Sequence, residues 1–504
     1  MTEPLLLALD QGTSSSRAVL FNPQGEPLAS AQVPLAIHYP ADGWVEQQAR
    51  AIWESQFQAM HELERALTPS QRRAVCACGV TNQRETTVLW RRSDGAAIGP
   101  ALVWQDRRTT DLCRRWQQRP DAAEWQQRTG LVLDPYFSAS KVRWLLDHTP
   151  AAADAQRSGD LCIGTVDSWL LWQLSGGELH ASDHSNASRT LLLDLEQRTW
   201  LPQALAAVGL SGEELPQLRP SRGGFGRIAA GLPFAGVPIT AVLGDQQAAT
   251  YGQLCLAAGQ AKCTYGTGAF LVVNVGEKPV RAEGGLLSTV GWSDASGSAS
   301  YCLEGSLFNA GTVVQWLRDG LGLISTASDV DALAASVPSS GELMLVPAFT
   351  GWGTPHWDPS ARGLLIGLTR DTSAAHVARA ALEGIALAVS TLVETAEAAL
   401  ATPLLELAVD GGAAASDVLM QAQADCSGLS VRRPPHLEST ARGVALMAGQ
   451  EAGVVADLEP LRQQLLSGAS RFSPQLSDHA RRAWRCRWQE AVRRCLHWQG
   501  DDHV

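Results

Sequence analysis

Residues 5–21 of the chain, LLLALDQGTSSSRAVLF, contain two apolar runs joined by small and polar residues. The runs LLLALD and SRAVLF are typical of buried strands, and QGTSS carries the glycine and serines that tight turns favour. A third run, PLASAQVPL at residues 27–35, follows the turn sequence PQGE. We therefore predict that the chain opens with three strands in a meander.

Helices and further strands follow this meander. Residues 47–67 have helical periodicity, and RRAVCACGVT at residues 72–81 returns to a strand pattern. Strands that alternate with helices indicate an α/β fold.

The opening pattern returns in the second half of the chain. GQAKCTYGTGAFLVVNVGE, residues 259–277, is again a strand, a small-residue turn and a strand, and residues 404–428 are a strand, a Gly-Gly turn and a helix. The chain has 504 residues, whereas hydrophobic cores stop growing near about 250–300 residues. We predict two related halves, residues 1–250 and 251–504, with the boundary between residues 245 and 255.

Composition excludes several classes of function. The net charge is −11 and the pI about 5.5, which argues against nucleic acid or an anionic membrane surface as a partner. The N-terminus lacks the features of a signal peptide, and no run of about 20 apolar residues predicts membrane insertion. The ten cysteines are scattered and contain no CxxC pair. We expect reduced, mostly buried thiols and a cytoplasmic location.

Three small-residue turns suggest phosphate binding. The first follows Asp10, the second contains Gly266 and Thr267, and the third is Gly411–Gly412. Small residues let backbone amides approach a phosphate, and a carboxylate at a strand end can hold Mg²⁺. Taken alone, the first turn could equally be a serine-rich β-turn beside an exposed aspartate. Three such turns over two related halves favour a clamp around one nucleotide. The chain has neither a GxxxxGK[ST] loop nor the protein-kinase motifs, so those two ATP-binding folds are excluded.

A cation and an anion stand side by side in GVTNQRETTVLW, residues 79–90. Arg84 offers a rigid fork of donors and Glu85 offers acceptors, which together suit a small polyol. A surface ion pair of little energetic value is the alternative interpretation of the two residues in isolation.

Longer segments carry a resemblance to a known family. They resemble the glycerol kinases of the FGGY carbohydrate kinases, and the similarity runs from about residue 5 to about residue 450, more weakly beyond. The segments that carry it are LALDQGTSSSR, GVTNQRETTVLW, LVWQDRR, YFSASKVRWLLDH, GTVDSWLLW, SNASRT, GDQQAATYGQL, AKCTYGTGAF, LVPAFTGWGTPHWDPSARGLLIGLTR and VDGGAAASDVLMQ.

The resemblance implies a fold and a reaction. The fold is α/β, with two RNase H-like domains of the actin/hexokinase/Hsp70 ATPase superfamily flanking a deep cleft. The reaction is Mg²⁺-dependent transfer of a phosphoryl group from ATP to glycerol, giving sn-glycerol 3-phosphate. The first half would hold glycerol and the first phosphate turn, and the second half would hold the second turn and adenosine. The family also implies a homodimer or homotetramer.

The resemblance also assigns roles to residues of this chain. Asp245 matches the catalytic base and also contacts glycerol, and Asp10 matches the metal-associated carboxylate. The remaining glycerol-contact positions are Arg84, Glu85, Tyr136, Gln246, Trp104 and Phe270. The ATP-contact positions are Thr13, Ser14, Ser15, Arg17, Gly266, Thr267, Gly311, Gln315, Gly411, Gly412 and Ser416. From the residues alone, Trp104 could instead be a core aromatic, and no role can be given to Lys141.

The chain departs from the family at several positions. Ser416 and Asp417 stand where many members have paired asparagines, and GWGTPHWD at residues 351–358 replaces GLGAPYWD. Arg442 occupies a position that is often apolar. GFGRIAAGLPFAGVP, residues 224–238, lacks the Gly-Gly-Lys-Gly-Gly-Thr-Arg loop of enzymes inhibited by fructose 1,6-bisphosphate. Different regulation, or none, is therefore expected.

Two other functions stay open on the sequence. One is another FGGY kinase, acting on xylulose, gluconate or erythritol. The other is a non-enzymatic, actin-like nucleotide switch, which would need neither Asp245 nor the polyol contacts.

Overall fold

The computed structural model describes residues 3–281, 283–435 and 438–498. A five-stranded sheet lies in the first half, in the order β13-β5-β1-β2-β3. β1 is antiparallel to β2 and β2 to β3, whereas β5 runs parallel to both β1 and β13. The bounds are β1 Leu5–Gln11, β2 Ser15–Phe21, β3 Pro27–Pro34, β5 Val75–Asn82 and β13 Ile239–Gly244. The predicted opening meander is confirmed.

A seven-stranded sheet in the second half repeats this arrangement. Its order is β16-β17-β15-β14-β20-β21-β22, and its central five strands have the order and directions of the first sheet. β14 therefore corresponds to β1, β15 to β2 and β20 to β5, which confirms that the two halves are related. The bounds are β14 Ala261–Tyr265, β15 Ala269–Gly276, β16 Leu287–Ser293, β17 Ala299–Leu307, β20 Glu406–Asp410, β21 Ser430–Arg433 and β22 Ser470–Phe472.

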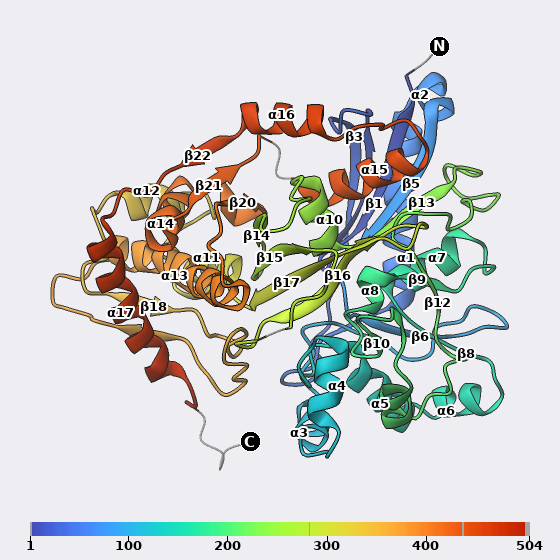
Figure 1. Cartoon of the computed structure of the whole chain (residues 1–504), viewed down its shortest axis with the longest axis horizontal. Coiled ribbons are helices and arrows are strands. Elements are labelled where there is room, and N and C mark those ends of the chain that lie inside the picture. Colours follow the sequence, from blue (N-terminus) through green and yellow to red (C-terminus); the bar gives the residue numbers. More distant parts are fainter. Residues whose placement is uncertain (1–2, 282, 436–437, 499–504) are drawn as a thin grey trace.

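Helices cover both sheets (Figure 1). Their bounds are α1 Ala49–Ala66, α2 Pro69–Ala74, α3 Thr110–Gln117, α4 Ala122–Thr129, α5 Ser138–His148, α6 Pro150–Arg157, α7 Val166–Leu174, α8 His184–Ala187, α9 Pro202–Val208, α10 Asp245–Gly252, α11 Gly311–Gln315, α12 Asp329–Ala335, α13 Ala374–Leu400, α14 Asp417–Ser427, α15 Ser439–Glu451, α16 Glu459–Gly468 and α17 Asp478–Cys495. A π-helical turn, Trp316–Gly320, follows α11, and a 3₁₀ turn, Gly412–Ala415, precedes α14.

Short strands complete the first half. β4, β7, β6 and β8 form a four-stranded sheet, and two-stranded pairs lie beside it and in the second half. Their bounds are β4 Glu46–Gln47, β6 Thr87–Arg91, β7 Ala101–Leu102, β8 Leu161–Thr165, β9 Ala181–Asp183, β10 Leu193–Asp194, β11 Thr199–Trp200, β12 Gln217–Arg219, β18 Met344–Val346 and β19 Leu364–Ile366. The four-stranded sheet and α3–α6 lie below the first large sheet in Figure 1.

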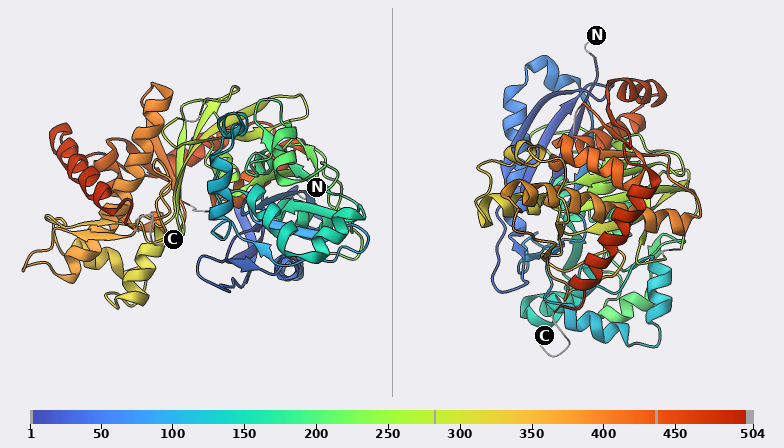
Figure 2. Two further views of the ribbon diagram at one scale, coloured as in Figure 1. Left: turned by 90° about the horizontal axis from the view of Figure 1, so that it is seen from below. Right: turned by 90° about the vertical axis from the view of Figure 1, so that its left-hand side faces the viewer.

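Each half has its own hydrophobic core. Leu7, Leu9 and Val80 pack under α1 and α7 in the first core, while Leu271, Leu303 and Val409 pack under α13 in the second. α13 is long and apolar enough to cross a membrane, yet 78% of its most apolar window is buried inside the protein. It is therefore placed as the central helix of the second core. The left view of Figure 2, which is seen from below, shows the blue-green first half and the orange second half on opposite sides of the molecule.

Two helices pack between the large sheets. α10 and α15 pack against each other, and Ala248 of α10 and Val444 of α15 share one apolar cluster with Leu6 and Ala8 of β1. Gly443 allows this approach, because a Cβ there would lie 1.8 Å from the Ala248 carbonyl oxygen. The predicted division at residue 250 stays a prediction, and α15 packs on the first sheet although it comes late in the chain.

The cysteines match their predicted pattern, and the last helix packs on the second core. All ten cysteines are unpaired, and eight are buried. Trp488 of α17 is buried and Trp484 packs at the edge of the second core, so α17 is a packed amphipathic helix. Trp498 is different, since it lies beyond the end of α17 and is 68% exposed.

Candidate active site

Arg84 and Glu85 form the turn that leaves β5, and both side chains are buried. Glu85 has a φ of 58°, a left-handed backbone conformation that is uncommon for a residue with a side chain. Such a conformation persists where surrounding contacts hold it. The two residues are therefore not the surface ion pair that the isolated dipeptide allowed.

A second arginine and a second glutamate hold this turn in place. Nη1 of Arg84 donates to Oε2 of Glu304 at 2.6 Å, and Nη2 donates to Oε1 at 2.9 Å. Nε of Arg189 donates to Oε1 of Glu85 at 2.6 Å, and Nη2 of Arg189 lies 3.2 Å from Oε1 of Glu304. Burial works to raise the pKa of Glu304, but Arg189 and Arg84 outweigh it and lower this pKa to about 2. Two cations and two anions thus balance one another inside the protein.

Sequence reasoning missed Glu304 and Arg189. Arg189 lies in SNASRT, a segment that carried the resemblance without a role, and Glu304 lies in the apolar strand β17. A single carboxylate within an otherwise buried strand was the available signal, because such a charge needs a partner.

Asp245 is the first residue of α10, where the helix dipole favours an anion. Its Oδ1 accepts from the backbone N–H of Gln246 at 2.7 Å and lies 3.1 Å from Nε of Arg84. About 32% of the side chain is exposed, so Asp245 can meet a substrate while held by Arg84. Burial raises the pKa of Asp245 above its ordinary value, and the charges of Arg84 and Lys262 oppose this rise.

An aromatic wall stands beside the Arg84–Glu85 turn, because Tyr136 faces the charges of both residues. The ring centroid of Trp104 lies 5.8 Å from that of Tyr136 and 6.0 Å from that of Phe270. Phe308 packs 6.0 Å from Tyr136, and Trp357 packs 6.5 Å from it, and neither had been predicted. The wall therefore joins the two halves. The Tyr136 hydroxyl makes no hydrogen bond to any residue that the structure describes, which leaves it available to a ligand.

The first phosphate turn touches this wall. Oγ1 of Thr13 accepts from Nε1 of Trp104 at 3.0 Å, and Oγ of Ser15 accepts from Nε2 of Gln32 at 2.9 Å, while Ser14 is exposed. Arg17 is ion-paired with Asp10, at 2.6 Å, and with Glu438. The hairpin is thus fixed by side chains from several parts of the chain.

A cavity of about 510 Å³ lies at the second turn. Six of the predicted nucleotide residues line it, namely Gly266, Thr267, Gly311, Gln315, Gly412 and Ser416. Gly311 is required there, because a Cβ would lie 2.6 Å from the Gly266 carbonyl oxygen. Gly411 does not line the cavity. It has a φ of 85°, and a Cβ would lie 2.5 Å from the carbonyl oxygen of Tyr265, so it serves the close approach of two backbones.

Ser416 has a structural partner in this cavity. Its hydroxyl donates to Asp331 and accepts from the backbone N–H of Leu419, which caps α14. The backbone N–H of Asp417 donates to Oδ2 of Asp331 at 2.9 Å. Asp331, which the sequence analysis did not single out, therefore accepts the hydrogen bond that the Ser416 hydroxyl donates. Asp331 also forms part of the cavity wall.

Asp10 has the chemistry of a magnesium-associated carboxylate. Only its Oδ2 is engaged, by Arg17, and Oδ1 has no hydrogen-bond partner among residues 3–281, 283–435 and 438–498. The same residues contain no group of three or more His, Cys, Asp or Glu side chains that could hold a metal alone. Mg²⁺ often takes one protein carboxylate together with water and substrate phosphates, and Asp10 fits that pattern.

A larger cavity opens beside the aromatic wall. It has a volume of about 1130 Å³ and takes its lining from both halves, including Trp104 and Arg107 from the first and Phe308 and Phe349 from the second. Arg107 also stacks on Phe308, with its guanidinium carbon 4.6 Å from the ring centroid. The cleft expected between the halves is therefore present, and Trp104 lies on its wall.

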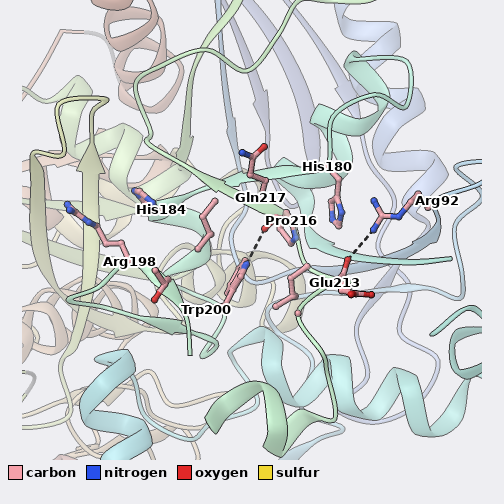
Figure 3. Close-up of a pocket in the computed structure, with 12 residues that line it drawn as sticks. Arg92, His180, His184, Arg198, Trp200, Glu213, Pro216 and Gln217 are labelled. Carbon is pink, nitrogen blue, oxygen red and sulfur yellow. Dashed lines mark hydrogen bonds between the residues drawn. The ribbon is translucent and has the colours of Figure 1, made fainter. Parts of the chain in front are cut away.

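Another cavity lies apart from these residues (Figure 3). It has a volume of about 630 Å³ and contains none of the predicted site residues; Arg92, His180, His184, Arg198 and Trp200 are among its lining. Burial lowers the pKa of both His180 and His184 to about 4. Each imidazole is held within the protein, by the Ile163 carbonyl and the Ser293 hydroxyl respectively. The two histidines are therefore neutral and serve packing.

Comparison with known sequences places the chain in a family. The description "FGGY family of carbohydrate kinases, N-terminal domain" matches residues 5–252, and the C-terminal domain of the same family matches residues 261–452. A protein of Aromatoleum aromaticum named "Glycerol kinase" is 51% identical over 494 residues, covering 98% of this chain and 99% of the relative. Relatives of the same name from Alkalilimnicola ehrlichii and Thermus brockianus are 48% and 49% identical over comparable lengths.

Solved structures agree with this placement. Plasmodium falciparum glycerol kinase with ADP superposes with a TM-score of 0.90 at 30% identity, with 98% of each chain covered. Gluconate kinase of Lactobacillus acidophilus superposes with a TM-score of 0.82 at 19% identity, over 98% of this chain and 97% of that one, which shows a shared fold. The chain belongs to the FGGY family of carbohydrate kinases.

Proposed function

We propose that this protein transfers the γ-phosphoryl group of ATP to a terminal hydroxyl of glycerol, giving sn-glycerol 3-phosphate and ADP. The observation that carries the proposal is the position of the buried Arg84–Glu85 turn, which faces both the partly exposed Asp245 and Tyr136 of the Trp104–Tyr136–Phe270 wall. Relatives named glycerol kinase, near 50% identical over almost the whole chain, support the choice of glycerol.

The site suits a short polyol because polar and apolar groups face each other across it. Arg84 has most of its donors engaged, so Glu85, Tyr136 and Gln246 supply the other hydroxyl contacts. Trp104 and Phe270 pack on the carbon backbone. Selectivity follows because a ligand that leaves these buried polar groups unpaired is rejected.

Asp245 acts as general base in this reaction. It accepts the proton of the attacking hydroxyl, while Arg84 holds the carboxylate in place at 3.1 Å. Phosphoryl transfer has a loose transition state, so the protein mainly positions the reactants and stabilises charge. Thr13, Ser14, Ser15 and Arg17 in the first turn, with Gly266 and Thr267 in the second, hold phosphate oxygens. Asp10 would hold Mg²⁺, which would supply positive charge to offset the charge of the phosphates.

The nucleotide is held by the second half. The cavity between Gly311, Gln315, Gly412 and Ser416 accepts adenosine, and Gly411 keeps the neighbouring turn close to Tyr265. We place the protein in the cytoplasm and expect a homodimer or homotetramer, as the family resemblance implies.

Tyr136→Phe gives a clean test of the substrate assignment. The hydroxyl has no partner within the described protein, so its removal leaves the fold intact. We expect the KM for glycerol to rise about 2–13-fold, the value of one hydrogen bond of about 0.5–1.5 kcal/mol, with Tm unchanged. Arg84→Ala is less informative, because it also strands the buried Glu304 carboxylate and lowers stability.

A substrate panel separates glycerol from the other FGGY substrates. ADP release from Mg-ATP is measured with glycerol, xylulose, gluconate, erythritol and dihydroxyacetone. Stimulation by glycerol above all others is expected. Stimulation by a different polyol would change the assigned substrate and leave the proposed mechanism in place. ATP binding without stimulation by any of them would favour a nucleotide switch.

A further inference from the structure

Lys262 lies in β14, and its side chain is fully buried. Nζ donates to Oε1 of Gln246 and to Oγ1 of Thr264, the latter at 2.7 Å. The Thr264 hydroxyl in turn donates to Oδ1 of Asp410. A continuous chain of hydrogen bonds therefore runs from the first turn of α10 to the end of β20.

The related first half shows that the fold does not need this charge. Asp10 pairs with Arg17 and Thr81 across the strands, and Thr264 pairs with Phe270 and Asp410 in the same way. Two residues earlier on the same face, the first half has the buried Ala8 where the second has Lys262. Burying an ammonium group costs several kcal/mol unless it is well paired, so a function other than strand formation accounts for the lysine.

The contact with Lys262 fixes the polarity of Gln246. A side-chain amide has one acceptor oxygen and one donor nitrogen, and the oxygen is taken by the ammonium group. The oxygen is thereby turned toward Lys262 and the NH₂ group away from it. In this orientation the amide NH₂ of Gln246 is the group that can donate to a polyol oxygen.

Lys262 also belongs to the charged surroundings of Asp245. The groups that face Asp245 are Arg84 from the turn after β5, Lys262 from β14 and Glu304 from β17, together with the N–H of Gln246. Lys262 itself faces Asp410 from β20, Asp245 and Glu304, and the thiol of Cys263. The thiols of Cys255 and Cys302 lie within the same field.

We propose that Lys262 is a positioning residue for phosphoryl transfer, an inference that rests on the proposed function. It holds the Gln246 amide as a donor to the substrate. It also ties the turn that bears the catalytic base to Asp410, beside the nucleotide turn Gly411–Gly412.

Lys262→Met tests the inference, because methionine is similar in length and carries neither charge nor donors. The KM for glycerol is expected to rise at least about tenfold, since the amide becomes free to rotate. The acid limb of the kcat/KM profile is expected to move up by about one pH unit. The acid limb moves to higher pH because loss of the Lys262 cation raises the pKa of Asp245. The base is then protonated at a higher pH.

Two substitutions of Thr264 form a matched pair of variants that test the inference while Lys262 stays in place. Thr264→Val breaks the chain at nearly constant volume, and Thr264→Ser keeps the hydroxyl. We expect Thr264→Val to raise the KM for glycerol and Thr264→Ser to leave it within about twofold of the starting protein. Circular dichroism and Tm confirm that each variant is folded, and this pair decides the question if Lys262→Met does not fold.

Two results would overturn the inference. One is a folded Lys262→Met protein whose KM and acid limb match those of the unchanged protein. The other is identical behaviour of Thr264→Val and Thr264→Ser. Activity of the unchanged protein with glycerol, measured first, keeps these outcomes distinct from failure of the proposed function. If the unchanged protein neither binds nor phosphorylates a polyol, both proposals fall together.

Discussion

The β1–β2 and β14–β15 hairpins have the same strand pairing but carry different side chains beside their turns. In the first, Asp10 lies one residue before the end of β1, opposite Arg17, and a four-residue turn, Gly12–Ser15, follows. In the second, Thr264 and Phe270 occupy the positions of Asp10 and Arg17, and the turn is Gly266–Gly268. The first hairpin therefore carries a carboxylate and a guanidinium beside its turn. The second carries a hydroxyl that links Lys262 to Asp410 and an aromatic ring that packs on Trp104.

The acidic position has moved between neighbouring strands. In the first sheet the carboxylate is on β1 and the hydroxyl of Thr81 on β5, whereas in the second the hydroxyl of Thr264 is on β14 and the carboxylate of Asp410 on β20. A repeated fold thus supplies two equivalent places, and side chains make them unequal. Such asymmetry is what a site with a donor and an acceptor substrate requires.

The largest effect is expected at the helices that follow the corresponding strands β13 and β21. Asp245 begins α10 beside Arg84, and Glu438 precedes α15 beside Arg17. Asp245→Asn should lower kcat by about 10²–10⁴-fold, the usual loss for a general base. Glu438→Gln, at a half-exposed side chain, should change kcat less than about tenfold. Steady-state kinetics with saturating glycerol and ATP measure both, and equal losses would refute the assignment of the base to one half.

A second comparison concerns the strands that pair with the second strand of each hairpin, namely β3 with β2 and β17 with β15. Glu304 on β17 is buried between two arginines, and its counterpart by register on β3 is Ser30, which is exposed. Glu304→Gln leaves cationic charge unpaired and should lower the free energy of unfolding by about 3–5 kcal/mol. Ser30→Gln should stay within about 0.5 kcal/mol of the unchanged protein. Urea denaturation followed by tryptophan fluorescence measures the difference, and a small effect of Glu304→Gln would mean that the network is not needed for stability.

The two glycines of the second turn should separate folding from nucleotide binding. A Cβ at Gly268 would lie 2.3 Å from the Leu307 carbonyl oxygen, so Gly268→Ala should cost about 1–3 kcal/mol of stability. A Cβ at Gly266 has no neighbour closer than 3.8 Å and faces the nucleotide cavity. Gly266→Ala should therefore keep its Tm and raise the KM for ATP. A lowered Tm in Gly266→Ala with an unchanged KM would contradict the assignment of this turn.

The smallest effect is expected at the capped helix of the second half. Ser416 caps α14, whereas α10 has no side-chain cap. Ser416→Ala should lower the free energy of unfolding by about 1 kcal/mol, with a modest rise in the KM for ATP because Asp331 loses a partner. Thermal unfolding with and without ADP measures both effects. A large loss of ATP affinity at constant Tm would instead indicate direct contact with the nucleotide.

Many of the strands, turns and helices could be predicted from local sequence patterns. The opening meander, the strand–turn–strand pattern that returns at residues 261–276, and the strand-to-helix turn at Gly411–Gly412 were predicted and are present. These features depend on neighbours in the chain, since strand periodicity and small turn residues act over a few positions. The resemblance then gave the roles of residues such as Asp245 and Tyr136, which the structure brings to one place.

The buried charges were decided only by the tertiary structure. Arg84 and Glu304 are 220 residues apart, and no local pattern links them. From the sequence alone, Lys262 is a polar residue in a largely apolar strand. Its contact with Gln246 of α10 is visible only in the structure. The packing of α15 on the first sheet, and the choice of Asp331 as partner to Ser416, have the same origin. The sequence by itself determined which segments become strands, turns and helices, because those preferences are local. Which distant ions neutralise each other depended on tertiary packing, because a buried charge is stable only where the fold brings its partner within reach.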